Sequence, residues 1–176
     1  KKSLTVETLS GIKTLELGVS FGKVKSVTVD MGQAVPAEDM TLNIDGETVV
    51  LTPVSVGNPH AVIFVDDIEK APLTTLGPKI EHHEAFADGV NVEFVQVLGN
   101  SELRMKVWER GSGVTMACGT GACASAVVAV KKKYCAYCEP ISVHLDGGTL
   151  KITVTPDNKV TMTGPAEFVY EGETME

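Results

Sequence analysis

The sequence has little of what nucleic-acid-binding and membrane proteins need. It contains one Trp, three Tyr and five Phe in 176 residues, and its 15 Lys and Arg against 23 Asp and Glu give a net charge of −8. Phosphate binding needs basic patches and base stacking needs aromatic rings, so these counts argue against a nucleic-acid partner. No apolar run approaches the roughly 20 residues of a membrane-spanning helix. Residues 1–6 lack the apolar core of a signal peptide, so we expect a cytoplasmic protein with no membrane segment.

Cysteines are also few. The sequence has four, Cys118, Cys123, Cys135 and Cys138. A chain of this length without an evident export signal does not resemble the small secreted modules that disulfides stabilise. With 43% apolar and 22% charged residues, it has the composition of a globular protein with its own core. We therefore expect reduced thiols, each of them reactive, metal-bound or simply buried.

Most of the sequence is typical of β-strands. β-branched and alternating apolar runs, bounded by Gly, Asn, Asp or Pro, indicate strands. Asp45-Gly46 and Gly147-Gly148 lie between such runs and predict hairpins. The expected strands are residues 24–30, 48–56, 61–65, 90–98, 103–108, 141–145, 150–155 and 160–163.

Only two segments are typical of helices. Residues 73–86 are polar and interrupted by Gly77-Pro78, which predicts a short or broken surface helix. Residues 121–133 are apolar on nearly every side and end in three lysines, which favour the negative C-terminal end of a helix. A helix that is apolar all round is buried. Many strands and one buried helix predict an α+β fold, in which mixed or antiparallel sheets wrap around that central helix.

Residues 109–124 are the segment that carries chemistry. A strand ends before them, a glycine-rich loop follows, and Cys118-Gly119-Thr120-Gly121 opens the buried helix. The first turn of a helix presents backbone N–H groups without internal partners, and its positive end stabilises a thiolate. We therefore expect the pKa of Cys118 to be lowered, at a site where a carboxylate and a reactive thiol meet. Such a site suits removal of a proton next to a carboxylate; the alternative is that Cys118 is only a small buried residue.

Three motifs in this order resemble the diaminopimelate epimerase family. They are Gly57-Asn58-Pro59-His60, the GVNVEF of residues 89–94, and the ERGSG and ACGTGA of residues 109–122. The resemblance extends over essentially the whole chain and implies a fold of two pseudo-symmetric lobes. It also implies an isomerase that interconverts LL- and meso-diaminopimelate with no cofactor, neither pyridoxal phosphate nor a metal. The pathway implied is the synthesis of lysine and of peptidoglycan precursors.

The resemblance also implies roles for individual residues. The catalytic residues it implies are Cys118, Glu109 and His60, with Cys118 as one of two cysteines that exchange the α-proton. The substrate-binding residues it implies are Asn58, Asn91, Glu109, Arg110, Gly119 and Thr120. Taken alone, Asn58 is a common turn residue, His60 a buried histidine, and Glu109 with Arg110 a surface ion pair. Asn91 is harder to explain in this way, because a buried amide in an apolar strand needs partners.

One motif of the family is missing from the sequence. The first cysteine motif resembles Met-Cys-Gly-Asn-Gly, and no such string occurs here. Cys123 lies about one and a half turns into the same helix as Cys118, so it cannot face that thiol across a substrate. We therefore expect residues 1–28 to be the last strands of an N-terminal lobe, 29–162 the C-terminal lobe, and 163–176 a strand returning to the N-terminal lobe. Without the missing lobe we expect no activity, and apolar surface that allows a homodimer.

Other interpretations stay open at this point. Proline racemase-like proteins resemble residues 118–121 but lack the Glu109-Arg110-Gly111 lead, and phenazine-biosynthesis-like isomerases lack the cysteine pair. Cys135 and Cys138 have the spacing of a zinc knuckle, although zinc needs two further ligands and no second pair is evident. A binding protein that has kept the fold and lost the chemistry is the third alternative.

Overall fold

The chain is α+β, as the sequence predicts. The computed structural model describes residues 2–8, 11–173 and 175. The first and last of the three expected parts include residues 1, 9, 10, 174 and 176, which lie outside this description. Its strands are β1 (Ser3–Thr8), β2 (Gly11–Ser20), β3 (Lys23–Gln33), β4 (Val35–Pro36), β5 (Met40–Ile44), β6 (Glu47–Ser55), β7 (Pro59–Phe64), β8 (Asn91–Gly99), β9 (Glu102–Glu109), β10 (Gly113–Thr115), β11 (Ile141–Leu145), β12 (Gly148–Val154) and β13 (Lys159–Pro165). Its helices are α1 (Leu73–Glu81), α2 (Gly119–Lys131) and the 3-10 turn η1 (Ile68–Lys70).

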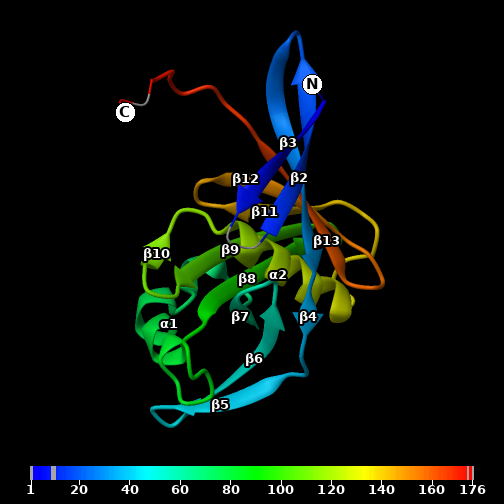
Figure 1. Cartoon of the computed structure of the whole chain (residues 1–176). Helices are drawn as coiled ribbons and strands as arrows, with labels where there is room; N and C mark the ends of the chain where they lie inside the picture. The colour runs from blue at the N-terminus through cyan, green and yellow to red at the C-terminus, as the bar shows by residue number, and fades with distance from the viewer. Residues whose placement is uncertain (1, 9–10, 174, 176) are drawn as a thin grey trace.

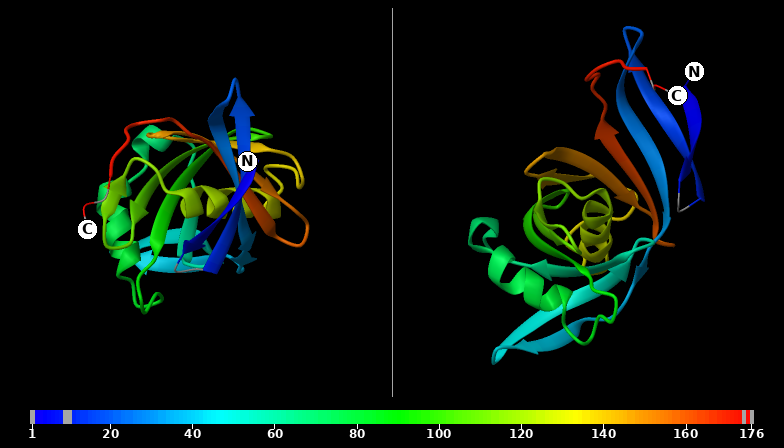
Figure 2. Two further views of the ribbon diagram at one scale, coloured as in Figure 1. Left: turned by 45° about the horizontal axis from the view of Figure 1, so that its top comes forward. Right: turned by 60° about the vertical axis from the view of Figure 1, so that its left-hand side comes forward.

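Curved strands surround the central helix α2 (Figure 1). The order in the sheet is β1-β2-β3-β13-β12-β11-β9-β8-β7-β6-β4, with β10 added to β9 and β5 added to β6. Strands β3 and β4 are separated only by Ala34, yet β3 pairs with β13 and β4 pairs with β6. This one stretch of chain therefore joins the two sides of the sheet and closes it around α2 (Figure 2).

The sequence of α2 explains its central position. Every residue from 121 to 130 is buried, so the helix has no polar face to present to water. The expected helix over residues 121–133 is confirmed with slightly earlier bounds. At its C-terminal end Lys132 pairs with Asp39 at 2.6 Å, which places a cation near the negative end of the helix dipole.

Helix α1 differs from the expected helix over residues 73–86. Of the two expected forms, short or broken, it is the short one: it ends at Glu81 and continues through Gly77-Pro78. A Cβ atom on Gly77 would lie 2.8 Å from the Cβ of Trp108, so the missing side chain lets the helix lie directly on this residue. Ile80 is fully buried one turn further on. Packing against the sheet thus offsets the hydrogen bond that proline removes.

The register of β7, β8 and β9 sorts their side chains onto two faces. Strand β7 runs parallel to β8 with His60 opposite Asn91, and β9 runs antiparallel to β8 with Val107 opposite Glu93. Since side chains alternate along a strand, His60, Asn91 and Glu93 share the face that Val107 presents to α2. Phe94 and its neighbours on the other face form a second core with α1.

Strands β1, β2 and the first part of β3 form an arm that projects from the closed body (Figure 2). Most residues of this arm are exposed, including the apolar side chains of Ile12, Val19 and Phe21. The arm continues the sheet through β13, whose residues 163–165 pair with residues 26–28 of β3. The described residues therefore leave an apolar surface of the arm uncovered.

Candidate active site

The ends of three strands and the start of α2 meet at one place. Strand β7 begins with Pro59 and His60, the parallel strand β8 begins at Asn91, and the antiparallel strand β9 ends at Glu109. The amide of Asn58, just before β7, donates to the hydroxyl of Thr120 in the first turn of α2 at 3.3 Å. The topology thus gathers residues that lie far apart in the sequence.

Cys118 is the N-cap residue of α2. Its Sγ accepts a hydrogen bond from the Gly121 N–H at 3.4 Å and lies 3.6 Å from Thr120 Oγ1. Burial raises the pKa of the thiol, and the charges of Glu93 and Glu109 add to this, whereas the two hydrogen bonds lower it. The net shift is upward. The expectation of a lowered pKa is therefore wrong, because desolvation by burial, the largest contribution, outweighs the helix N-terminus.

A chain of hydrogen bonds leads from a buried carboxyl group to Cys118. Glu93 Oε1 lies 2.7 Å from Nδ1 of His60, and His60 Nε2 lies 3.0 Å from Oδ1 of Asn58. The Asn58 amide then donates to Thr120, whose hydroxyl is the one beside Cys118. Three residues that the sequence predicts for the site, Asn58, His60 and Thr120, are thus connected to the predicted reactive thiol.

Asn91 braces the strands around this chain. Its Nδ2 donates to the carbonyl of Pro59 at 2.9 Å, and its Oδ1 accepts from the backbone N–H of Arg110 at 3.0 Å. One buried amide therefore ties the start of β7 to the loop after β9. These partners explain why an asparagine is tolerated in an otherwise apolar strand.

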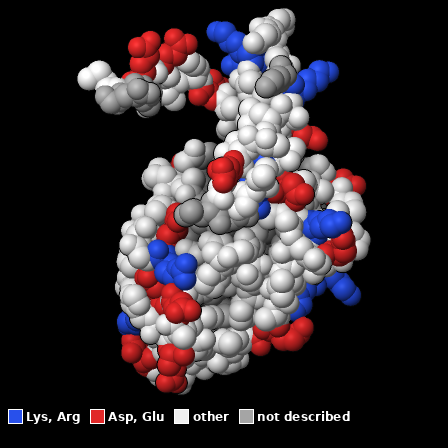
Figure 3. Space-filling view, in the orientation of Figure 1, with Lys and Arg blue, Asp and Glu red and all other residues white. Residues whose placement is uncertain are grey.

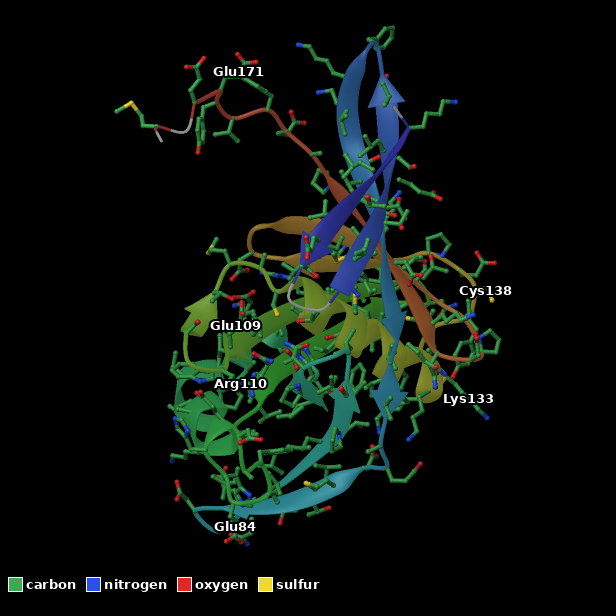
Figure 4. The ribbon with its side chains drawn as sticks, in the orientation of Figure 1. Glu84, Glu109, Arg110, Lys133, Cys138 and Glu171 are labelled. Atoms are coloured by element: carbon green, nitrogen blue, oxygen red, sulfur yellow. The ribbon has the colours of Figure 1, made fainter. Side chains whose placement is uncertain are left out.

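Glu109 and Arg110 lie at the end of β9 and point in different directions (Figure 4). The carboxylate of Glu109 accepts a hydrogen bond from the Thr115 hydroxyl across the β9–β10 hairpin. It is close enough to Cys118 to raise the pKa of the thiol. The guanidinium of Arg110 instead donates to the Asp88 carbonyl at 3.0 Å. The structure thus brings Glu109 to the thiol and leaves the Arg110 head group in a surface pocket.

Two buried glutamates, Glu81 and Glu93, support the site although the sequence patterns do not assign them to it. Glu81 accepts from Trp108 Nε1 at 2.6 Å and from the Gly111 N–H at 2.7 Å, which anchors the loop after β9. Burial acts to raise the pKa of Glu81, but these hydrogen bonds outweigh it and hold the pKa below its ordinary value. The sequence could have indicated Glu93 as a site residue, because it is a carboxyl group in an apolar strand and lies two residues after Asn91, on the same face of that strand.

The other three cysteines lie outside this group of contacts. Cys123 is fully buried within α2, and burial raises its pKa to about 12. Cys135 is buried beyond the end of α2, and Cys138 is exposed on the opposite side of the molecule from Glu109 (Figure 4). Among residues 2–8, 11–173 and 175, no three His, Cys, Asp or Glu side chains are grouped to hold a metal ion. Among these residues, the structure therefore adds no further zinc ligands to Cys135 and Cys138.

The closed sheet around a buried helix is a fold that this chain shares with solved structures of an epimerase and of a phenazine biosynthesis protein. A hydroxyproline epimerase from Agrobacterium vitis has a TM-score of 0.73 at 18% identity, covering 97% of this chain and 58% of its own. A phenazine biosynthesis protein of the PhzF family from Bacillus anthracis has a TM-score of 0.69 at 15% identity, covering 100% of this chain and 69% of its own. At these identities the likeness shows the fold alone.

Sequence comparison then identifies the family among proteins with this fold. A family model described as diaminopimelate epimerase matches residues 52–169. The diaminopimelate epimerases of Geobacillus thermodenitrificans and Bacillus licheniformis are each 51% identical over 97% of this chain. The chain belongs to the diaminopimelate epimerase family, a family of isomerases, as the motifs predict. It spans 64% and 65% of the lengths of these two relatives.

Proposed function

We propose that the protein interconverts LL- and meso-diaminopimelate by exchanging one α-proton between two cysteines. A thiolate takes the α-proton on one face, the electron pair delocalises into the adjacent carboxylate, and a thiol on the opposite face returns a proton to carbon. The observation that carries the proposal is Cys118 at the N-cap of α2, hydrogen-bonded to its first turn. As the family resemblance implies, the proposed reaction uses neither pyridoxal phosphate nor a metal.

The first turn of α2 is where the reacting carboxylate would bind. Backbone N–H groups there, including those of Gly119 and Thr120, have no partners within the helix. They point at an anion, and they stabilise it more strongly as negative charge builds up during proton removal.

The remaining site residues would bind the other polar groups of the substrate. Glu109, with its carboxylate near Cys118, suits the ammonium group of an amino acid centre. Asn58 can bind either polar group through its amide. Arg110 can grip the carboxylate of the far amino acid centre in a two-pronged contact once its guanidinium leaves the Asp88 carbonyl. As the family resemblance implies, His60 would orient the groups at the reacting end or take part in protonation there.

The second thiol of the proposed mechanism has no candidate among the described residues, since Cys123 lies in the same helix as Cys118. We propose that it belongs to an N-terminal lobe, to which residues 1–28 and 163–176 also contribute. The uncovered apolar arm, with Ile12 and Phe21 exposed, supports this proposal. So does the middle of the face in Figure 3, which carries few charged side chains. Without that lobe, residues 1–176 are then inactive. A second copy of the chain in a homodimer is the alternative cover for the arm.

The setting of the reaction is proposed on the same resemblance. The product would serve the synthesis of lysine and of peptidoglycan precursors, in the cytoplasm. Within residues 2–8, 11–173 and 175, the helices are all too short or too polar to cross a membrane. The proposed substrate, diaminopimelate, is a small molecule.

The test uses the full-length protein, which means residues 1–176 together with the proposed N-terminal lobe. The protein is kept reduced and is incubated with LL-diaminopimelate in heavy water. We expect α-deuterium to enter the substrate while it converts to the meso form, measured by mass spectrometry and chiral separation. Cys118→Ala should abolish both, whereas Cys138→Ala, on the opposite side of the molecule, should not. An intact, reduced wild-type protein that exchanges no deuterium would refute the proposal, and proline and hydroxyproline would be tested next.

A further inference from the structure

Glu93 is a carboxyl group enclosed completely by the protein. It is 0% exposed in the middle of β8, and one of its oxygens, Oε1, contacts His60 Nδ1 at 2.7 Å. The other oxygen, Oε2, is buried with no hydrogen-bond partner among the described residues. A buried carboxylate needs partners for both oxygens, whereas an uncharged carboxyl group tolerates an unpaired carbonyl oxygen far better. Burial also raises the pKa of Glu93.

Glu93 lies directly beneath the start of the catalytic helix. A Cβ atom on Gly121 would stand 2.8 Å from Glu93 Oε1 and 3.2 Å from Cys118 Sγ. Only a glycine at this position lets the carboxyl group and the thiol approach the first turn of α2 together. The ionisable groups that face Glu93 are therefore His60 from β7, Cys118 from α2 and Glu109 from β9.

We propose that Glu93 is a positioning residue that acts in its uncharged form, donating its proton from Oε1 to His60 Nδ1. His60 then carries its own proton on Nε2 and donates it to Asn58 Oδ1, 3.0 Å away. This fixes the Asn58 amide so that Nδ2 donates to Thr120, whose hydroxyl proton is left to point at Cys118 Sγ. Every donor in the chain thus points toward the thiol. The catalytic part of this inference rests on the proposed epimerase function.

The chain matters for catalysis because Cys118 must lose and regain a proton in the two directions of the reaction. A hydroxyl that donates to sulfur stabilises the thiolate, and the carboxyl–imidazole pair keeps that hydroxyl correctly oriented. If Glu93 were ionised, His60 Nδ1 would instead carry a proton and donate it to Glu93 Oε1, while the second carboxylate oxygen stayed buried without a partner. The two arrangements differ at His60 Nδ1, which is measurable.

The experiment measures His60 and Cys118 separately from turnover. The full-length protein is labelled with 15N-histidine, and His60 is assigned among the four histidines of this sequence with a His60→Asn variant. At neutral pH we expect His60 to be protonated on Nε2 and bare on Nδ1. Glu93→Gln should keep that tautomer, because its amide can donate to Nδ1, whereas Glu93→Leu should give a mixture of tautomers. Alkylation of Cys118, followed by peptide mass spectrometry over a range of pH, should slow about tenfold in Glu93→Leu, equivalent to one charge-assisted hydrogen bond.

Ser125→Ala is the matched control. Ser125 is fully buried one turn along α2, and its hydroxyl donates to the Gly121 carbonyl at 2.8 Å, so this variant also removes a buried polar group near the site. It should lower stability and leave the His60 tautomer unchanged. In the epimerase assay Glu93→Leu should lower kcat about 100-fold, as expected for misplaced catalytic groups, and Glu93→Gln should recover most of that loss.

The outcomes separate the two proposals. A proton on His60 Nδ1 in the wild-type spectrum overturns the inference even if no variant folds. An unchanged tautomer and unchanged Cys118 alkylation in folded Glu93→Leu overturn it as well. Absence of turnover with diaminopimelate in the wild type overturns only the proposed function, because the spectrum and the alkylation profile still report on Glu93.

Discussion

Replacement of Gly121 by alanine tests whether the start of α2 is packed as tightly as the structure indicates. The new Cβ atom would lie 2.8 Å from Glu93 Oε1, 3.2 Å from Cys118 Sγ and 3.3 Å from Cys118 Cβ. Glu93 is 0% exposed, so its oxygen has no solvent-filled space into which it can move. Either the carboxyl group, the thiol or the helix itself must shift.

Two opposing free energies decide the size of the effect. Alanine is better than glycine within a helix by about 0.5–1 kcal/mol. Overpacking a well-packed core costs about 1–3 kcal/mol, and the neighbours here are a buried carboxyl oxygen and a sulfur atom held by hydrogen bonds. We therefore expect Gly121→Ala to lower the free energy of unfolding by about 1 kcal/mol. Activity should fall further, by about 100-fold, because the groups displaced are those that handle the proton.

Urea unfolding of the full-length protein, followed by fluorescence, gives the stability change, and the deuterium assay gives the activity. Gly119→Ala is the control for stability, because its Cβ atom would meet the flexible end of Met162, with Sδ at 3.2 Å, instead of a buried carboxyl group. That variant should be as stable as the wild type. If Gly121→Ala proved as stable as the wild type and its Cys118 were alkylated at the same rate, the close packing of Glu93 against α2 would be refuted.

Three further predictions concern the surroundings of the site. Gly77→Ala should destabilise the protein by about 1–3 kcal/mol, because its Cβ would collide with Trp108; an unchanged urea midpoint would contradict this. The lowered pKa of Glu81 means that this group stabilises the fold above its ordinary pKa and that the contribution is lost as pH falls through the folded-state pKa. Glu81→Gln should therefore lower the Tm at neutral pH, and the Tm of the variant should fall less on acidification than that of the wild type. Parallel curves of Tm against pH for the two proteins would contradict this prediction. Iodoacetamide should label the exposed Cys138 quickly and spare the buried Cys123, whose pKa is about 12, until the protein unfolds; equal labelling rates in the native protein would show that α2 is not enclosed.

The central helix and most strands were predictable because their sequences are locally consistent. Ten consecutive buried residues of α2 admit no polar face, and the alternating apolar runs of β6, β8 and β9 match the observed strands closely. Strand β2 was expected only in outline, as one of the strands over residues 1–28, and the structure gives its bounds as Gly11–Ser20. Helix α1 was expected to be short or broken at Gly77-Pro78. It is short and unbroken, and Trp108, distant in the sequence, packs closely against Gly77.

The site was predictable in its members but not in its electrostatics. The motif around Cys118 and the presence of Asn58, His60 and Thr120 could be read from the sequence, and the structure connects all four. The direction of the thiol pKa could not, because it depends on carboxyl groups that β8 and β9 bring to the helix, and on burial by the closed sheet. A local argument from the helix dipole sees none of these contributions.

The raised pKa of Cys118 bears directly on how a two-cysteine epimerase would use this residue. The proposed reaction needs one thiolate and one thiol at the start, and the raised pKa of Cys118 favours the thiol form of this residue. In the opposite direction the same residue must be the base, so its thiolate cannot be too unfavourable. The hydrogen bonds from Gly121 N–H and Thr120 supply the compensation, acting against burial and Glu109. An uncharged Glu93 removes a further negative charge from beside the thiolate. On this reasoning the orientation of the Thr120 hydroxyl, more than the helix dipole, decides how readily Cys118 changes between acid and base.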